Sequence, residues 1–206
     1  MDMTTSAQPE ILLIGRLRSP FVRRTAILLD LLGLDFAHDP IAALTEQEAL
    51  RAHNPVGRVP ALHIGDRVLV DSLVIALTLL DLYDQDGALL PRAGWERADA
   101  LRLIALSNGV TERAVTAYYE RTRRPEDKIW PDWVELARGQ ARQGLDALEG
   151  EAPDPASPLD YVQVCLVTSL AFLETAEPGL LDPEHHPRLT ALLRNREAEP
   201  PFTARS

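Results

Sequence analysis

The stretch Arg18-Ser19-Pro20-Phe21-Val22-Arg23-Arg24 decides the fold, because it marks the point where a strand gives way to a helix. Before it lies the short aliphatic run Ile11–Ile14, closed by a glycine, which is typical of a buried strand. After it, apolar residues recur at helical spacing until Gly33 ends the helix. Ser19 then occupies the N-cap and Pro20 the first helical position, where its missing N–H does no harm.

The start of this helix has the features of an anion site. A serine hydroxyl and several unpaired backbone N–H groups should face the same point at the top of the strand, and such a place favours a phosphate, a carboxylate or a thiolate. The alternative is that the Ser19 hydroxyl only caps its helix, as serines commonly do. The local pattern leaves both interpretations open.

Length and composition limit the kinds of protein that this chain can be. The chain has 206 residues, enough for one large domain or two small ones, and 46% of them are hydrophobic, which is ample for a buried core. No segment approaches the roughly 18 uncharged apolar residues of a membrane span, and residues 1–9 lack the regions of a signal peptide. Cys165 is the only cysteine, so we expect no internal disulfide and a cytoplasmic location.

The net charge of −10 and the pI of about 4.9 disfavour nucleic acid as a partner, because a domain that follows a phosphate backbone is normally basic. Three arginine clusters are local exceptions, and most such runs are solvated. One that lies near the anion site would steer an acidic ligand toward it. The clusters are Arg16–Arg18, Arg23–Arg24 and Arg121–Arg124.

The first 84 residues predict the order βαβαββα. The second strand should run parallel to the first, since a helix lies between them. A turn-rich loop containing Val59 and Pro60 leads into two strands that a tight turn joins as a hairpin. After the first helix, the expected elements are a strand within 34–41, a short helix at 45–52, strands at 61–64 and 68–70, and a helix from Asp71-Ser72 to about Tyr83.

Beyond a linker at residues 85–94, the pattern predicts only helices. Ser157-Pro158-Leu159-Asp160 should start the central one, with Ser157 at the N-cap and Asp160 bonding back to it. That helix is nearly all apolar and should be the core of the helical half. The expected helices are 95–121, 130–148, 159–174 and 187–196.

Four motifs in this order resemble the cytosolic glutathione S-transferase (GST) family, over about Ile11 to Phe202. The likeness is greatest to serine-type bacterial enzymes with tau-like or theta-like N-terminal domains. It implies an α/β thioredoxin-like domain at 10–84 that binds glutathione, a linker at 85–94 and an all-α domain at 95–206. The motifs are Ser19–Arg24, Asn54–Leu62, Val70–Ser72 and Ser157–Asp160.

The resemblance also implies the chemistry. Only the thiolate of glutathione is a good nucleophile, and a hydroxyl donor at a helix start favours that charged form. Ser19 stands where the family has its Ser or Tyr donor. Its role would be a hydrogen bond to the sulfur, with no covalent step at the serine.

Five further residues correspond to the family's glutathione contacts. Pro60 stands where the family has a cis-proline, which would present the Val59 backbone to the cysteinyl part of glutathione; a trans proline opening an edge strand is the alternative. Ser72 would bind the γ-glutamyl carboxylate and Asp71 its ammonium, unless both are only helix caps. Arg58 would reach the glycyl carboxylate, or it is simply solvated.

The helical half offers fewer assignments. Related bacterial sequences often have an aspartate where Asn108 stands, so a contact to the neighbouring subunit's glutathione is in doubt. A hydrophobic electrophile should lie against helices of this half, and four aromatic residues either line its site or belong to the core. These are Tyr118, Tyr119, Trp130 and Trp133.

Two other sequence features have no expected functional role. His185-His186 lacks further ligands at metal spacing, so we expect no metal. Cys165 lies among aliphatic residues of the central helix and should be an inert core residue.

The resemblance implies an enzyme that conjugates glutathione to electrophiles in detoxification and forms a two-fold homodimer. In that dimer, the N-terminal domain of one chain would lie against the helical domain of the other. A glutathione-dependent thiol reductase would need a cysteine at position 19. A non-catalytic scaffold of the stringent-starvation type need not keep the glutathione residues.

Overall fold

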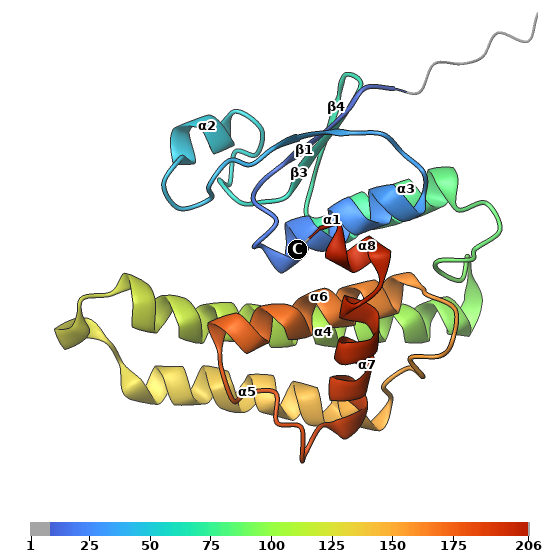
Figure 1. The fold of residues 1–206 in the computed structure, drawn as a ribbon. Coiled ribbons are helices and arrows are strands. Elements are labelled where there is room, and N and C mark those ends of the chain that lie inside the picture. Colours follow the sequence, from blue (N-terminus) through green and yellow to red (C-terminus); the bar gives the residue numbers. More distant parts are fainter. Residues whose placement is uncertain (1–8, 206) are drawn as a thin grey trace, which may run out of the picture. The chain divides into compact units, whose positions relative to one another are not determined.

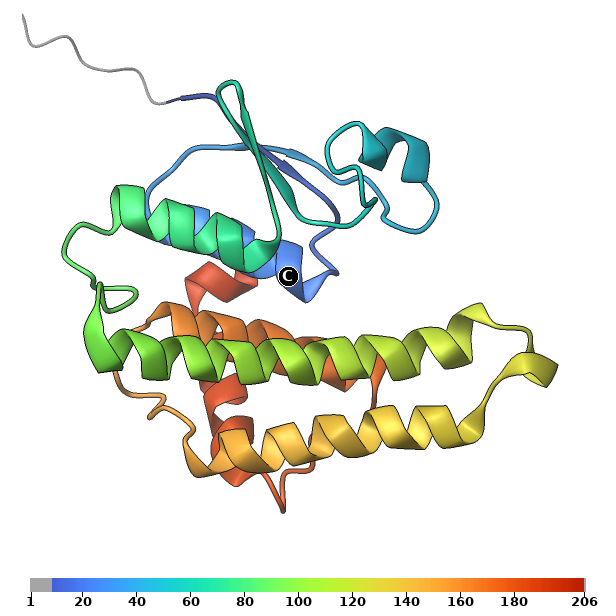
Figure 2. The same cartoon turned by 180° about the vertical axis from the view of Figure 1, so that it is seen from behind.

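The computed structural model describes residues 9–205, which divide into a compact unit ending at Leu79 and a second beginning at Leu80. The expectation of no signal peptide falls on the start of the chain, which lies outside the described residues apart from Pro9. The first unit combines a sheet with helices, whereas the second is helical (Figures 1 and 2). This confirms the predicted α/β, thioredoxin-like architecture followed by an all-α half.

The first unit contains a four-stranded mixed sheet with the order β2-β1-β3-β4. β1 and β2 are parallel as predicted, and the pairs β1–β3 and β3–β4 are antiparallel. β2 lies within the predicted range of 34–41 and ends directly before Pro40, which has no N–H for a further ladder bond. The strands are β1 (Ile11–Ile14), β2 (Ala37–Asp39), β3 (Ala61–Ile64) and β4 (Arg67–Val70).

Side-chain alternation along the strands gives the sheet two buried faces. Leu13 and Leu62 pair across β1 and β3 and are fully buried on one face. Ile14 and Ala61 point to the other face, where they form a cluster with Leu50. Three helices belong to this part: α1 (Pro20–Leu31) and α3 (Ser72–Tyr83), which lie side by side in both views, and the short α2 (Gln47–Arg51) (Figures 1 and 2).

The second unit is built around the predicted central helix, α6, on which nearly every residue is buried. Each long helix lies within a few residues of its predicted range. The terminal helix α8 was not predicted; the fully buried Phe202 anchors it. The helices are α4 (Gly94–Arg123), the 3₁₀ turn η1 (Glu126–Lys128), α5 (Pro131–Gly150), α6 (Tyr161–Ala176), α7 (Pro187–Glu197) and α8 (Pro200–Thr203).

The predicted N-cap at Ser157 is wrong. α6 begins at Tyr161, and Oδ1 of Asp160 accepts a hydrogen bond from the Gln163 N–H at 2.8 Å. The Ser157 hydroxyl instead donates to the carbonyl of Asp154 at 2.7 Å. Aspartate is among the strongest N-cap residues, and Asp160 lies closer to the apolar run that forms the helix. Burial raises the pKa of its carboxyl group.

The Arg121–Arg124 cluster is not simply a solvated face. Arg121 forms an ion pair with Glu177, a carboxylate with no exposed surface that also binds Arg138. Arg124 pairs with Glu120. A buried carboxylate needs such partners because an unpaired charge in the interior is strongly unfavourable.

None of the helices within residues 9–205 combines the length and the apolar composition that crossing a bilayer requires.

Candidate functional site

The register of the sheet brings the predicted site residues of the first unit to one end. Ile14, the last residue of β1, pairs with Ala61, the first residue of β3, and Ala61 pairs with Val70, the last residue of β4. The segment that follows β1, the segment that precedes β3 and the segment that follows β4 therefore emerge together. They carry Ser19, Arg58–Pro60 and Asp71–Ser72, respectively.

Gly15 allows two of these segments to approach closely. Its φ is +124°, and a Cβ at this position would lie 2.7 Å from Cγ2 of Val22 and 2.8 Å from Cβ of Val59. Its N–H donates to the carbonyl of Asp39 at 2.8 Å, and its carbonyl lies 2.6 Å from Nε2 of His38. The loop that leads to Ser19 is thus packed against Val59.

Ser19 occupies the predicted N-cap of α1, with Pro20 at the first helical position. Its hydroxyl makes no capping hydrogen bond, and the side chain is half-buried. Its backbone N–H donates to the carbonyl of Arg16 at 3.0 Å, and its carbonyl accepts from the N–H of Arg23. The alternative that the hydroxyl only caps the helix is therefore wrong, and this hydroxyl is available to a ligand at the positive end of α1.

The peptide bond between Val59 and Pro60 is cis, as expected. Pro60 is buried and Val59 is half-buried. Pairing of β3 with its neighbours starts only at Ala61, and the backbone of Val59 has no hydrogen-bond partner within residues 9–205. An extended ligand would find unpaired backbone groups at this position.

Asp71 caps α3, as the alternative of a simple helix cap predicted, but it uses only one carboxylate oxygen to do so. Oδ1 accepts from the N–H groups of Leu73 and Val74, at 2.9 and 3.2 Å. Oδ2 has no hydrogen bond to the described part of the chain. The residue has a φ of +71°, which aspartate tolerates better than most residues. Ser72 opens the helix and is only 4% exposed.

Arg58 is exposed and forms no ion pair with any described residue. The amide of Asn54 fixes its backbone by donating to its carbonyl at 2.8 Å. The backbone of Arg58 is therefore held at the same end of the sheet, and its exposed side chain is accessible to an anion.

Three of the four aromatic residues considered for the electrophile site are exposed. Trp130, Trp133 and Tyr119 have exposed fractions of 60%, 36% and 38%, and the two indole rings stack with centroids 6.2 Å apart. Tyr118 is half-buried, as is Asn108 on α4. Of the two alternatives, the core is excluded for Trp130, Trp133 and Tyr119.

The structure explains the other signals. Cys165 is fully buried within α6, as predicted. Nε2 of His186 lies 2.9 Å from Asp146 and its Nδ1 accepts from the N–H of Asp182, so this histidine is tied into the fold. Among the described residues, no three side chains of the kinds that bind metals gather into a site.

A contact between His53 and His63 was not predicted from the sequence. Nδ1 of His53 lies 2.8 Å from Nε2 of His63. Burial, followed by the proximity of His53, lowers the pKa of His63. No local pattern signals this pair, because one residue belongs to a strand and the other to a turn ten positions earlier.

Comparison with known proteins identifies the protein family. A family model for the N-terminal domain of glutathione S-transferases matches residues 13–87. Glutathione S-transferase Z1 of Arabidopsis thaliana is 32% identical over 71% of this chain and 67% of its own length. The GST-like protein YibF of Escherichia coli K12 is 29% identical over 92% of this chain and 98% of its own.

A solved structure agrees over nearly the whole chain. A glutathione transferase family member from Pseudomonas fluorescens Pf-5, with bound glutathione, has a TM-score of 0.83 and 31% identity, and the match covers 95% of this chain and 98% of the other. The chain belongs to the cytosolic glutathione S-transferase family.

We expect Gly15→Ala to lower the free energy of unfolding by about 3 kcal/mol, because the new Cβ would collide with Val22 and Val59 and the positive φ would be strained. Urea denaturation measures this loss. Gly65→Ala is the matched control, since Gly65 also has a positive φ but no atom lies within 4 Å of the place that a Cβ would take there. That variant should lose only about 1 kcal/mol, and equal losses in the two variants would contradict the close approach.

Proposed function

We propose that the protein is a glutathione transferase that activates the glutathione thiol for conjugation to a hydrophobic electrophile. In this proposal, residues 10–84 form the glutathione-binding domain, 85–94 the linker and 95–206 the helical domain. The single observation that carries the proposal is the Ser19 hydroxyl, which stands at the start of α1 and makes no capping hydrogen bond. The bound glutathione of the Pseudomonas relative supports it.

The chemistry follows from the position of this hydroxyl. The thiol of glutathione is mostly protonated at neutral pH, whereas its thiolate is the nucleophile. A hydrogen bond donated by Ser19 and the positive end of the α1 dipole both favour the thiolate over the thiol, so they lower the thiol pKa. The sulfur then forms a bond to the electrophilic carbon. Either a leaving group departs with its electron pair, or the resulting carbanion takes a proton from solvent, while Ser19 stays unmodified.

The same end of the sheet offers a group for each part of the tripeptide. The unpaired backbone of Val59 would bond to the cysteinyl residue as an added strand does. Ser72 would hold the γ-glutamyl carboxylate at the positive end of α3, whereas Oδ2 of Asp71 would bind its ammonium. Arg58 would bind the glycyl carboxylate.

Two other functions fit less well. A thiol reductase of the cysteine type would need a thiol at position 19, where this chain has a serine. A non-catalytic scaffold has no need for a hydroxyl without a capping bond, at Ser19, and unpaired backbone groups, at Val59, at the same end of the sheet. Calorimetry with glutathione separates these cases, because absence of binding at millimolar ligand would favour the scaffold.

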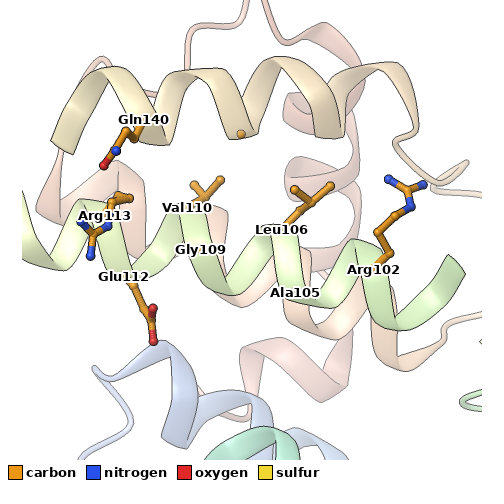
Figure 3. A pocket seen from close by; sticks show the side chains of 9 residues that line it. Arg102, Ala105, Leu106, Gly109, Val110, Glu112, Arg113 and Gln140 are labelled. Carbon is orange, nitrogen blue, oxygen red and sulfur yellow. The ribbon is translucent and has the colours of Figure 1, made fainter. Parts of the chain in front are cut away.

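We also propose a homodimer that uses the groove between α4 and α5. This groove has a volume of about 560 Å³, and Leu106, Gly109 and Val110 form its apolar floor (Figure 3). Glu112 and Arg113, consecutive residues of α4, are also among its lining residues. Opposite charges beside one another suit a two-fold contact, in which each acid of one copy meets a base of the other.

Ser19→Ala should abolish thiol activation and largely retain binding, because it removes only the donor to the sulfur. We expect conjugation to slow by about 10²-fold, with the thiolate absorbance of bound glutathione titrating at higher pH. Ser157→Ala is the matched control, since Ser157 also precedes a proline ahead of a helix but belongs to the second unit. An unchanged titration in Ser19→Ala would refute the role of this hydroxyl.

Asp71→Asn should weaken glutathione binding by about tenfold, since a hydrogen bond to a charged group is worth roughly that much. Asparagine still caps α3 and tolerates a positive φ, so the unfolding free energy should hardly change. Calorimetry measures the affinity and urea denaturation the stability. Equal affinities of the variant and the parent would show that Asp71 is only a cap.

Leu106→Arg should convert the dimer to a monomer in analytical ultracentrifugation, because it places an unpaired charge in the floor of the groove. Trp95→Arg, a similar change at an exposed position of the same helix, should leave the dimer intact. A Leu106→Arg protein that still sediments as a dimer would exclude this face.

A further inference from the structure

The two histidines that contact each other connect the sheet to the segment that precedes the site. His63 lies on β3, and His53 lies in the turn directly after α2. Their ring nitrogens are 2.8 Å apart, and the rings meet edge to face with centroids separated by 5.0 Å. Both side chains are half-buried. This bond ties the end of α2 to the sheet.

The segment after His53 is held together by Asn54, which is only 5% exposed. Its amide donates to the carbonyl of Arg58 at 2.8 Å, and its Oδ1 accepts from the N–H of Val56 at 3.0 Å. Its carbonyl accepts from the N–H of Gly57, also at 2.8 Å. These bonds hold the loop together, and Gln47 ties it to α2 by donating to the carbonyl of Gly57 at 2.9 Å. The contact of His53 with His63, which fixes the end of α2 on the sheet, therefore helps to fix where Arg58 and Val59 lie.

The surroundings of His63 contain few charges. Its partner on β1 is Leu12 and its partner on β4 is Val68, so both neighbouring strands present apolar residues. From the side of α2 it faces His53. The charged residues of α2, Glu48 and Arg51, are exposed, and Arg51 bonds to Gln47 at 3.4 Å. The lowered pKa of His63 is therefore caused by its burial and by the neighbouring His53 ring.

We propose that the His53–His63 pair is a positioning device for the Asn54–Pro60 loop, and that the loop loses its glutathione-binding geometry when both rings are protonated. This inference rests on the proposed function. In the neutral pair, one ring nitrogen donates and the other accepts. A first proton enters on a nitrogen outside the bond and leaves it intact. A second proton must occupy the accepting nitrogen, which removes the bond and places two cations together.

The direction of the pH dependence follows from the lowered pKa of His63. A histidine whose pKa is lower in the folded state stabilises that state above its ordinary pKa, and the stabilisation is lost as the pH falls through the folded-state value. The loop should therefore be ordered at neutral pH and released under mildly acidic conditions.

The test is calorimetry of S-methylglutathione binding from about pH 7.5 to pH 5.5. This probe has no thiol, and its carboxylates stay ionised over this range. Its amine only gains protons as the pH falls, which would strengthen the contact with Asp71 and therefore does not produce a loss of affinity. We expect the affinity of the parent protein to fall by about threefold or more. His63→Gln should bind like the parent at neutral pH but without this fall, because glutamine can donate or accept a hydrogen bond and carries no charge.

Two further variants exclude other causes. His53→Asn should flatten the profile as His63→Gln does. His38→Gln should keep the fall, because protonation of His38 preserves the Nε2–H that donates to the carbonyl of Gly15. A flat profile in the parent, or a fall that persists in both pair variants, would overturn the positioning role. Failure of the parent to bind the probe at any pH would refute the proposed function, and this inference with it.

Discussion

The approach of Gly15 to Val59 is the constraint on which the site depends. The two residues belong to segments more than forty positions apart, and no side chain fits between them. A residue with a Cβ at position 15 would push the loop that carries Ser19 away from the backbone that precedes β3. The register Ile14–Ala61–Val70 adds the start of α3 to the same edge. One tight contact and one register thus unite three segments.

Each of these segments leaves a polar group unused by the fold. The Ser19 hydroxyl does not cap α1, and the Val59 backbone lies just outside the hydrogen-bonded part of β3. Asp71 caps α3 with a single oxygen. Polar groups in partly buried positions normally find partners within the protein. A ligand that supplies the partners best explains the two partly buried groups, at Ser19 and Val59, and the exposed second oxygen of Asp71 is accessible to the same ligand. The tripeptide proposed above has the matching chemistry.

The helical unit differs in how its charged and apolar residues are distributed. α6 is almost entirely buried, and the charges near it are paired, as the contact of Glu177 with Arg121 and Arg138 illustrates. From α4 onward, the exposed large apolar side chains of this unit lie on α4, on α5 and directly before α5: Trp95, Tyr119, Trp130, Trp133 and Leu136. Exposed apolar surface of this kind usually marks a contact with another molecule.

The sequence by itself determined the order of the elements and the family. Local signals sufficed for this: the serine and proline before α1, the hairpin, the cis-proline motif and the apolar run of α6. The N-cap of α6 was misassigned because two good capping residues, Ser157 and Asp160, lie within one turn, and the one nearer the apolar run is the cap. The sequence also left open whether the aromatic residues considered for the electrophile site are buried or exposed, since spacing alone does not separate core from surface.

Only the tertiary structure decided which polar groups remain unpaired and which distant residues meet. That Ser19 makes no capping bond, that Asp71 uses one oxygen and that His53 reaches His63 all depend on side-chain geometry across separate elements. Periodicity and capping preferences report on neighbours within a few residues along the chain. Contacts between a strand and a turn are set by the register of the sheet and the shape of the core, which no local pattern encodes.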